Sequence, residues 1–302
     1  MTLAAEPQLG PVRGAGEQER DIRYRPLWSR WRHSPSAVVG ALISGTIVLL
    51  ALISLVWTPD NPLRIPVIQH AFSPPSGSHL LGTDQYGRDV LSRLMAGTQI
   101  TLYGGIVSVL IAAIVGIPGG LYAAQRGGVR SDIIMRAADL MFAFPALLIA
   151  MILAADFGGS TLTAMIAIGV AYVPIFARVT RGAALQVLNT EYILAARASG
   201  ESAAVILRRH VLPNIISTVI VQMTLLFSLA VLAEAALTYL GLGTPPPTPS
   251  WGHMLQTAQN YLYNDPLLTV WPGLMIAVTV LGFNLLGDGL REVLDPRGVR
   301  NQ

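Results

Sequence analysis

The chain has 302 residues; 52% of them are hydrophobic, only 12% are charged, and the mean hydropathy is +0.54. Because soluble domains carry about 25% charged residues, this composition excludes an ordinary soluble domain and indicates an integral membrane protein. The chain has no cysteine, which excludes disulfides and thiol catalysis. It also has no lysine, and a Walker A phosphate loop requires one, so any ATP hydrolysis must belong to another chain.

The predicted elements begin with a polar, arginine-rich tail at residues 1–35. Its first dozen residues lack hydrophobic periodicity and are predicted to be disordered. A signal peptide places its apolar core within about the first 30 residues. Here the first apolar run begins later, so we expect the tail to be retained. Residues 36–302 are predicted to form a single transmembrane domain without an internal repeat.

A membrane span needs about 20 apolar residues, and six runs meet or approach that length. We therefore predict an all-α protein with about six transmembrane helices, at about 37–57, 98–124, 133–155, 160–177, 213–240 and 269–290. An even number of spans places both termini on one side. Of the 20 arginines, 17 lie on that side, and only Arg64, Arg88 and Arg93 lie opposite. The positive-inside rule makes the first side cytoplasmic, and it explains the basic residues without a nucleic-acid partner.

The first external segment is predicted at 58–97. Its second half has the pattern of an amphipathic helix, in which Asp84 and Arg88, and also Asp89 and Arg93, are spaced for i,i+4 ion pairs. We weigh two interpretations of this helix: it lies on the membrane surface, or it contributes to a docking surface.

The second external segment is predicted at 241–268. Three consecutive prolines favour an extended path there, and Trp251 is predicted to anchor the segment at the outer membrane interface. Such a segment suits contact with a substrate-delivery protein, and a plain linker with interface anchors is the alternative.

Polar residues inside a span are costly, so each one needs a reason. Glu234 lies in the fifth predicted span. It is either a polar group in the outer part of a translocation path or a hydrogen-bonding group that holds the outer end of the bundle together. Met223, Phe227 and Asn284 are further candidates for the path, with ordinary packing as their alternative role.

The remaining charged residues predict structure rather than chemistry. Asp132, Arg136 and Asp139 follow one helix face and predict an ion-pair ladder near the cytoplasmic surface. The five histidines are scattered and show no paired spacing typical of a metal site. We therefore predict no catalytic and no metal-binding residue.

A polar stretch at 181–212 separates the fourth and fifth predicted spans on the cytoplasmic side. Small residues give the stretch from 191 to 200 helical character, and Gly200 permits the left-handed turn that ends a helix. Pro213 stands at a favoured helix-start position and is predicted to open the fifth span. A broken, arginine-bearing segment of this kind suits presentation to a soluble partner; an ordinary basic loop is the alternative.

This stretch resembles the "EAA" loop of ABC-importer permease subunits. That loop has two alanines, a glycine four residues after the second, and a Leu-Pro pair that begins twelve residues after the glycine. The matching positions here are Ala195, Ala196, Gly200, Leu212 and Pro213. Two positions depart from the pattern, because the acidic residue of the motif is Leu194 here and its isoleucine is His210. Glu191, one helical turn before Leu194, is our candidate for the missing carboxylate.

Three further runs, at 79–94, 247–252 and 283–297, resemble the dipeptide/oligopeptide branch of these importers, and specifically its C-type permease subunit. The resemblance covers about residues 24–302 and implies a type I ABC-importer permease fold in the cell membrane. It also implies partners besides the lipid bilayer: a second, homologous permease chain, two ATPase subunits that bind ATP and Mg²⁺, and an external substrate-binding protein. The chain itself is not expected to be an enzyme or to bind a cofactor.

The resemblance further implies that the loop at 186–213 contacts an ATPase subunit. The residues expected to do so are Glu191, Ala195, Ala196, Arg197, Gly200, Leu212 and Pro213. The substrate stays open, because this branch also takes up nickel, haem, glutathione and other small solutes. Two other classes of protein remain as alternatives: a secondary transporter or channel, which needs no ATPase, and a membrane scaffold. Neither explains the spacing from Ala195 to Pro213.

Overall fold

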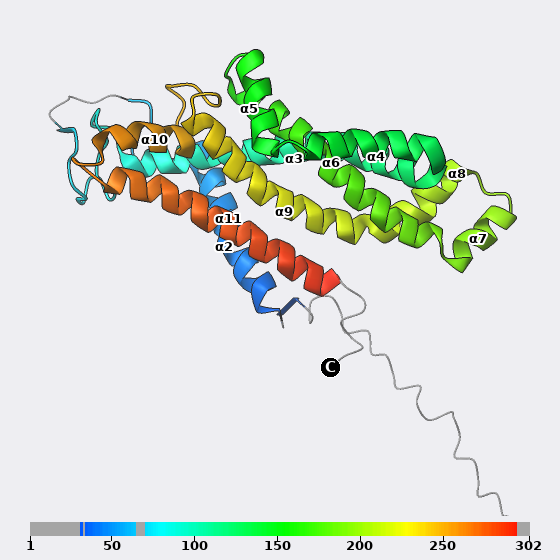
Figure 1. The fold of residues 1–302 in the computed structure, drawn as a ribbon. Helices are drawn as coiled ribbons and strands as arrows, with labels where there is room; N and C mark the ends of the chain where they lie inside the picture. Colours follow the sequence, from blue (N-terminus) through cyan, green and yellow to red (C-terminus); the bar gives the residue numbers. More distant parts are fainter. Residues whose placement is uncertain (1–30, 33, 65–69, 295–302) are drawn as a thin grey trace, which may run out of the picture.

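The computed structural model describes residues 31–32, 34–64 and 70–294, so the predicted tail lies almost entirely outside the described residues. The described part of the chain consists of helices and connecting loops (Figure 1). The helices are α2 (Pro35–Val56), α3 (Val90–Arg126), α4 (Gly128–Phe142), α5 (Ala146–Asp156), α6 (Thr161–Leu188), α7 (Glu191–Ala198), α8 (Ala203–Val205), the π-helix η2 (Ile206–Val211), α9 (Leu212–Tyr239), α10 (Trp251–Ala258), the 3-10 helix η3 (Gln259–Tyr261) and α11 (Leu267–Leu294).

Within the described residues, five helical runs are long and apolar enough to cross a membrane: α2, α3, α6, the run from Ala203 to Tyr239, and α11. α4 and α5 together form a sixth, bent unit. The helices form an elongated bundle with α10 at one end and α7 at the other (Figure 1). These are called the α10 end and the α7 end below. The all-α membrane fold predicted from composition and apolar runs is thus confirmed.

The predicted third span, 133–155, is not one straight helix. α4 ends at Phe142, α5 begins at Ala146, and the two are bent by 84°. Pro145 lies at the break. Proline has no N–H group and disfavours the helical conformation of the residue before it, so the helix is interrupted there. At 1.5 Å per residue, α4 and α5 are about 22 and 16 Å long, so neither crosses a core of about 30 Å alone.

The amphipathic helix predicted at the end of the first external segment is the first part of α3. Asp89 caps α3 by accepting a hydrogen bond from the Ser92 amide at 2.8 Å. Val90 and Leu94 are buried in one cluster with α10. The interpretation as a separate helix on the membrane surface is therefore wrong. The 37 residues of α3 extend over about 55 Å, which carries this segment beyond the hydrocarbon core.

The fifth predicted span begins before Pro213. Helical structure starts at Ala203, passes through η2 and continues into α9, where Pro213 is the second residue. Proline cannot donate a hydrogen bond to the preceding turn. The π-helix directly before Pro213 has wider i→i+5 hydrogen bonding, and the helix continues through the proline. α6 likewise continues beyond the fourth predicted span, as far as Leu188.

Glycines allow two pairs of helices to approach closely. Gly116 and Gly120 of α3 lie directly against the backbone of α6, where a Cβ atom would collide with it. Between the first and last described long helices, Gly40 of α2 and Gly289 of α11 do the same, and a Cβ atom at Gly282 of α11 would collide with the Ile43 side chain. Without a hydrophobic driving force between helices in lipid, close packing through small residues is a main source of helix association.

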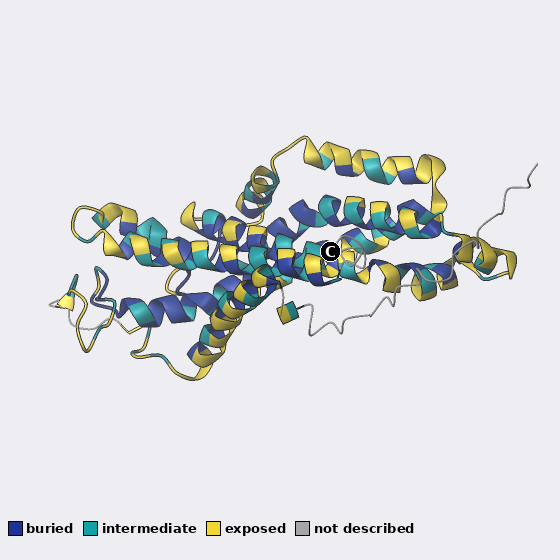
Figure 2. Ribbon diagram, turned by 90° about the horizontal axis from the view of Figure 1, so that it is seen from below, coloured by how far each residue is buried: buried dark blue, intermediate teal, exposed yellow. Residues whose placement is uncertain are grey.

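Burial divides the helices into packed and outward faces (Figure 2). A main core cluster joins α2, α3, α5, α6, α7, η2 and α9, and a smaller cluster lies around Trp251 at the α10 end. Large apolar residues on the outward face of α2, such as Leu42 and Leu49, are exposed. In a membrane such residues face hydrocarbon, which is the arrangement expected of a spanning helix.

Candidate functional site

α7 occupies the end of the bundle opposite to α10 (Figure 1). It has acidic Glu191 in its first turn and basic Arg197 in its last turn, and both charges are favourable to the helix dipole. A helix of eight residues is too short to be stable alone. Ile193 attaches α7 to the bundle, because its side chain is 0% exposed and packs in the main core cluster.

α7 ends in a Schellman motif at Gly200. The Gly200 amide donates to the Arg197 carbonyl at 3.0 Å, and the Glu201 amide donates to the Ala196 carbonyl at 3.1 Å. Gly200 has φ +84°, so the left-handed turn predicted there is present. A Cβ atom at this position would meet nothing within 4 Å. The backbone conformation, rather than crowding, therefore favours glycine.

Polar contacts attach α7 to the helical run that follows it. Asn214 of α9 donates to the Tyr192 hydroxyl at 3.3 Å and to the His210 carbonyl at 2.6 Å. His210 Nε2 lies 2.9 Å from Glu201 Oε2, and the Tyr192 and His210 rings are 6.3 Å apart. Sequence reasoning marked His210 only as a departure from a motif and missed Tyr192 and Asn214, because their meeting depends on the return of the chain after Gly200.

The residues predicted to contact an ATPase lie on both sides of this unit. The exposed ones on α7 and its end are Glu191, Ala195, Arg197 and Gly200. Ala196 is half-buried against the core. Leu212 and Pro213 lie beyond η2, in the first turn of α9. Leu194 is 55% exposed and Glu191 is exposed one turn earlier, so both side chains are available to a partner.

At the α10 end, the segment before α3 folds around buried charges. Arg88 Nε lies 2.7 Å from Asp84 Oδ2, and both side chains are largely buried, so this predicted ion pair is confirmed. The predicted pair of Asp89 and Arg93 is not formed. Asp89 caps α3 and lies 3.1 Å from His79 Nδ1, while Arg93 Nη1 approaches Asp84 Oδ2 at 3.6 Å. The cluster thus fixes the external segment onto the start of α3.

Trp251 is an internal residue rather than the predicted interface anchor. Its side chain is 0% exposed, and its Nε1–H donates to the Leu94 carbonyl at 3.0 Å. Gly97 makes room for the indole, since a Cβ atom there would lie 2.9 Å from the ring. Ser250 caps α10 by accepting a hydrogen bond from the His253 amide, which places Trp251 at the start of the helix, facing α3.

The predicted ladder of Asp132, Arg136 and Asp139 is absent from the described residues. Asp139 instead forms an ion pair with Arg178 of α6, and the Arg178 guanidinium lies 4.1 Å from the centre of the Phe142 ring. The ladder fails because α6 offers a cation from a neighbouring helix, which spacing along one helix does not reveal.

Glu234 is buried, with 1% of its surface exposed. Its Oε1 accepts a hydrogen bond from the Thr238 hydroxyl at 2.9 Å. That hydroxyl accepts from the Thr244 amide at 3.2 Å, and the Thr161 hydroxyl donates to the Thr244 hydroxyl at 3.2 Å. The network joins α9, the loop after it and the start of α6. Of the two interpretations of Glu234, this geometry favours the hydrogen bond that holds one end of the bundle together.

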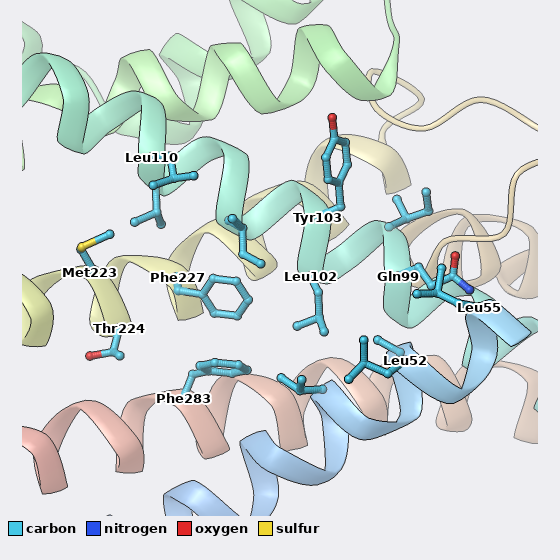
Figure 3. Close-up of a pocket in the computed structure, with 15 residues that line it drawn as sticks. Leu52, Leu55, Gln99, Leu102, Tyr103, Leu110, Met223, Thr224, Phe227 and Phe283 are labelled. Atoms are coloured by element: carbon cyan, nitrogen blue, oxygen red, sulfur yellow. The ribbon is translucent and has the colours of Figure 1, made fainter.

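A large groove of about 700 Å³ opens between α2, α3, α9 and α11 (Figure 3). Its walls are almost entirely apolar. Met223 and Phe227, both predicted to lie on a translocation path, line it, and the Phe227 and Phe283 rings are 4.2 Å apart. Glu234 and Asn284 do not line this groove. The structure therefore brings together two of the four predicted path residues.

Comparison with known proteins places this geometry in a family. Residues 116–300 match the family model described as binding-protein-dependent transport system inner membrane component. The di/tripeptide transport system permease protein DppC of Pseudomonas aeruginosa is 39% identical, over 90% of this chain and 92% of the relative. The dipeptide permease DppC of Alkalihalophilus pseudofirmus is 36% identical, over 91% and 90%. The glutathione permease GsiD of Pectobacterium atrosepticum is 36% identical, over 93% and 94%.

A solved structure has the same fold. The inward-facing methionine ABC transporter MetNI matches with a TM-score of 0.55 at 20% identity, over 67% of this chain and 96% of that chain. The family model covers more than half of the chain, and the relatives above match nearly all of it. The chain therefore belongs to the family of binding-protein-dependent transport system inner membrane components.

Proposed function

We propose that this chain is one of two related permease subunits in an ATP-driven importer of di- and oligopeptides. The observation that carries this proposal is the similarity, over about nine-tenths of both chains, to permeases named for dipeptide and di/tripeptide transport. The chain acts as a permease and not as an enzyme. Two ATPase subunits bind ATP and Mg²⁺ and hydrolyse the nucleotide on the cytoplasmic side, and a substrate-binding protein delivers the peptide from outside.

In this proposal α7 is the contact with an ATPase subunit. Its exposed face combines Leu194 and Ala195 with the charges of Glu191 and Arg197. Its inner face is attached to the bundle through Ile193 and through Asn214. A displacement of α7 by the ATPase would therefore be transmitted directly to α9. The α7 end and both termini lie in the cytoplasm, which the distribution of arginines supports.

Single cysteines test both the contact and the orientation, because the chain has none of its own. Ala195→Cys carries a thiol-linked photo-cross-linker in the assembled complex. We expect an adduct with an ATPase subunit, and we expect a membrane-impermeant maleimide to reach this cysteine only in inverted vesicles. Tyr263→Cys is the matched control at the α10 end, where the side chain is fully exposed; it should react only from outside and give no ATPase adduct. An ATPase adduct from Tyr263→Cys alone would overturn the proposal.

A glutathione importer is the second candidate, because one relative named for glutathione is 36% identical over 93% of this chain. Reconstituted complex with its binding protein separates the two candidates. We expect ATP-dependent uptake of a labelled dipeptide, with glutathione as a weak competitor. Uptake of glutathione that excess dipeptide does not reduce would assign the chain to the second candidate instead.

A further inference from the structure

A second groove, of about 610 Å³, lies between α9 and α11 at the α7 end. It is lined by Pro213, Asn214, Ser217, Thr218, Val221, Gln222, Leu225, Arg291 and Leu294. The α9 residues among these recur every three or four positions, so they form a single face of the helix. From Pro213 to Leu225 this face extends over about 18 Å, which is more than half of a hydrocarbon core of about 30 Å.

The polar side chains of this groove have no partners within the described part of the chain. The side chains of Ser217, Thr218 and Gln222 make no hydrogen bond to other described residues. A polar group that faces hydrocarbon without a hydrogen bond is costly. The apolar groove beside Phe227 (Figure 3) carries no such cost, because its walls suit lipid. Water or a polar ligand in the polar groove would supply the missing hydrogen-bond partners.

The inner end of the polar groove is closed by a contact between its two helices. A Cβ atom at Gly287 of α11 would lie 2.9 Å from Thr224 Oγ1 and 3.1 Å from Leu225 Cδ2. One turn further along α11, Arg291 borders the open part and is the only charged residue among those that line it. The groove thus has one cationic group on α11 and neutral hydrogen-bonding groups along α9.

We propose that this groove is the cytoplasmic part of the solute path. Arg291 binds a carboxylate of the solute, and Ser217, Thr218 and Gln222 exchange hydrogen bonds with its amide groups. A guanidinium suits a carboxylate because its fork of N–H donors matches the two oxygens. A small peptide has both kinds of group, so this inference rests on the proposed function and adds the residues that receive the peptide.

The groove is also attached to α7. Asn214 lines its mouth and donates the 3.3 Å hydrogen bond to Tyr192 of α7. A movement of α7 therefore displaces a residue of the groove directly. This contact gives the proposed ATPase site a route to the solute that does not depend on the rest of the bundle.

Thiol labelling of the assembled complex tests whether the groove holds water. Thr218→Cys and Gln222→Cys are treated with a charged, water-soluble thiosulfonate. The matched control is Ile220→Cys, between them on α9, where the native side chain faces outward. The reactive thiolate forms only where water solvates it, so we expect the two groove cysteines to react at least about tenfold faster than the control. Equal rates would overturn the assignment of a water-filled groove.

Ligand chemistry is tested with a dipeptide and with the same dipeptide as its C-terminal amide. The free dipeptide should slow labelling of Gln222→Cys, and the amide should not. In uptake, wild-type complex and Arg291→Lys should prefer the carboxylate form, and Arg291→Gln should transport both forms at the same reduced rate. Labelling that neither peptide slows, or a carboxylate preference that survives in Arg291→Gln, would overturn the ligand assignment. Failure of the proposed function would differ, because wild-type complex would then take up no dipeptide at all.

Discussion

Replacement of Ile193 by alanine tests whether α7 must stay attached to the bundle. The change removes three carbon atoms from a side chain that is 0% exposed. At about 0.8 kcal/mol per buried carbon the transfer loss is about 2.4 kcal/mol, and the cavity left behind raises the cost to about 3 kcal/mol. Because α7 is stabilised by its attachment rather than by its own eight residues, the cost lowers the ratio of attached to detached α7 about 100-fold.

Hydrogen exchange of the amides at 191–200 in the assembled complex measures this ratio, because exchange follows the population of the open state. We expect exchange about 100-fold faster in Ile193→Ala, unchanged exchange in the middle of α9, and reduced peptide uptake. Leu194→Ala is the matched control, since it changes the next residue of the same helix, whose side chain is 55% exposed. It should leave exchange unchanged and weaken the association with the ATPase.

If the amides at 191–200 exchange in Ile193→Ala at the same rate as in the wild-type protein, the reasoning is refuted, because this buried side chain then does not hold α7 in place. Loss of peptide uptake in Ile193→Ala without faster amide exchange would also refute the reasoning, since the loss of uptake would then not arise from detachment of α7.

Three further changes have defined outcomes. Gly200 has φ +84°, so Gly200→Val should destabilise this turn by about 1–2 kcal/mol and reduce substrate-stimulated ATPase activity without loss of assembled complex. Gly200→Asn should retain the activity, because asparagine tolerates this conformation. Equal losses of activity in the two variants would contradict the role of the turn. Trp251→Phe removes the indole N–H that donates to the Leu94 carbonyl, which still accepts from the Thr98 hydroxyl. It should lower the free energy of unfolding by about 0.5–1.5 kcal/mol in thermal unfolding, and a neutral result would contradict a net contribution of this hydrogen bond. Burial lowers the pKa of His253, although its hydrogen bond with Gln256 acts in the opposite direction. The contribution of neutral His253 to the free energy of unfolding should therefore be complete above pH 6.5 and be lost as the pH falls below that value. His253→Gln should flatten this pH dependence, and an unchanged dependence in the variant would contradict the role of His253.

Hydropathy predicted where the long helices lie, and local backbone stereochemistry predicted where α7 ends. Apolar runs located the five long helical runs, and the left-handed turn at Gly200 could be predicted because only its own backbone decides it. The bend at Pro145 was missed, because the apolar run continues across the proline. At Pro213 the error was the reverse: the proline was predicted to begin the fifth span, but the helical run continues through it from η2 into α9.

Contacts between distant segments could not be predicted from the sequence. The i,i+4 spacing correctly predicted the ion pair of Asp84 and Arg88, but Asp139 forms its ion pair with Arg178 on another helix. Glu234 was recognised as unusual, yet its hydrogen-bonded network depends on a loop that returns to α9. The polar face of α9 is visible as a helical pattern, but only the position of α11 beside it makes a groove.

The close contact of α2 with α11 has a consequence for biosynthesis. These are the first and the last long helices of the described chain, and their glycines allow the two backbones to touch. At about 5–20 residues per second, synthesis from residue 57 to residue 266 takes on the order of 10–40 s. During that time α2 is inserted without the helix that it packs against. A ribosome-bound chain that stops before α11 therefore exposes the glycine face of α2 to lipid, insertion factors and quality-control proteases.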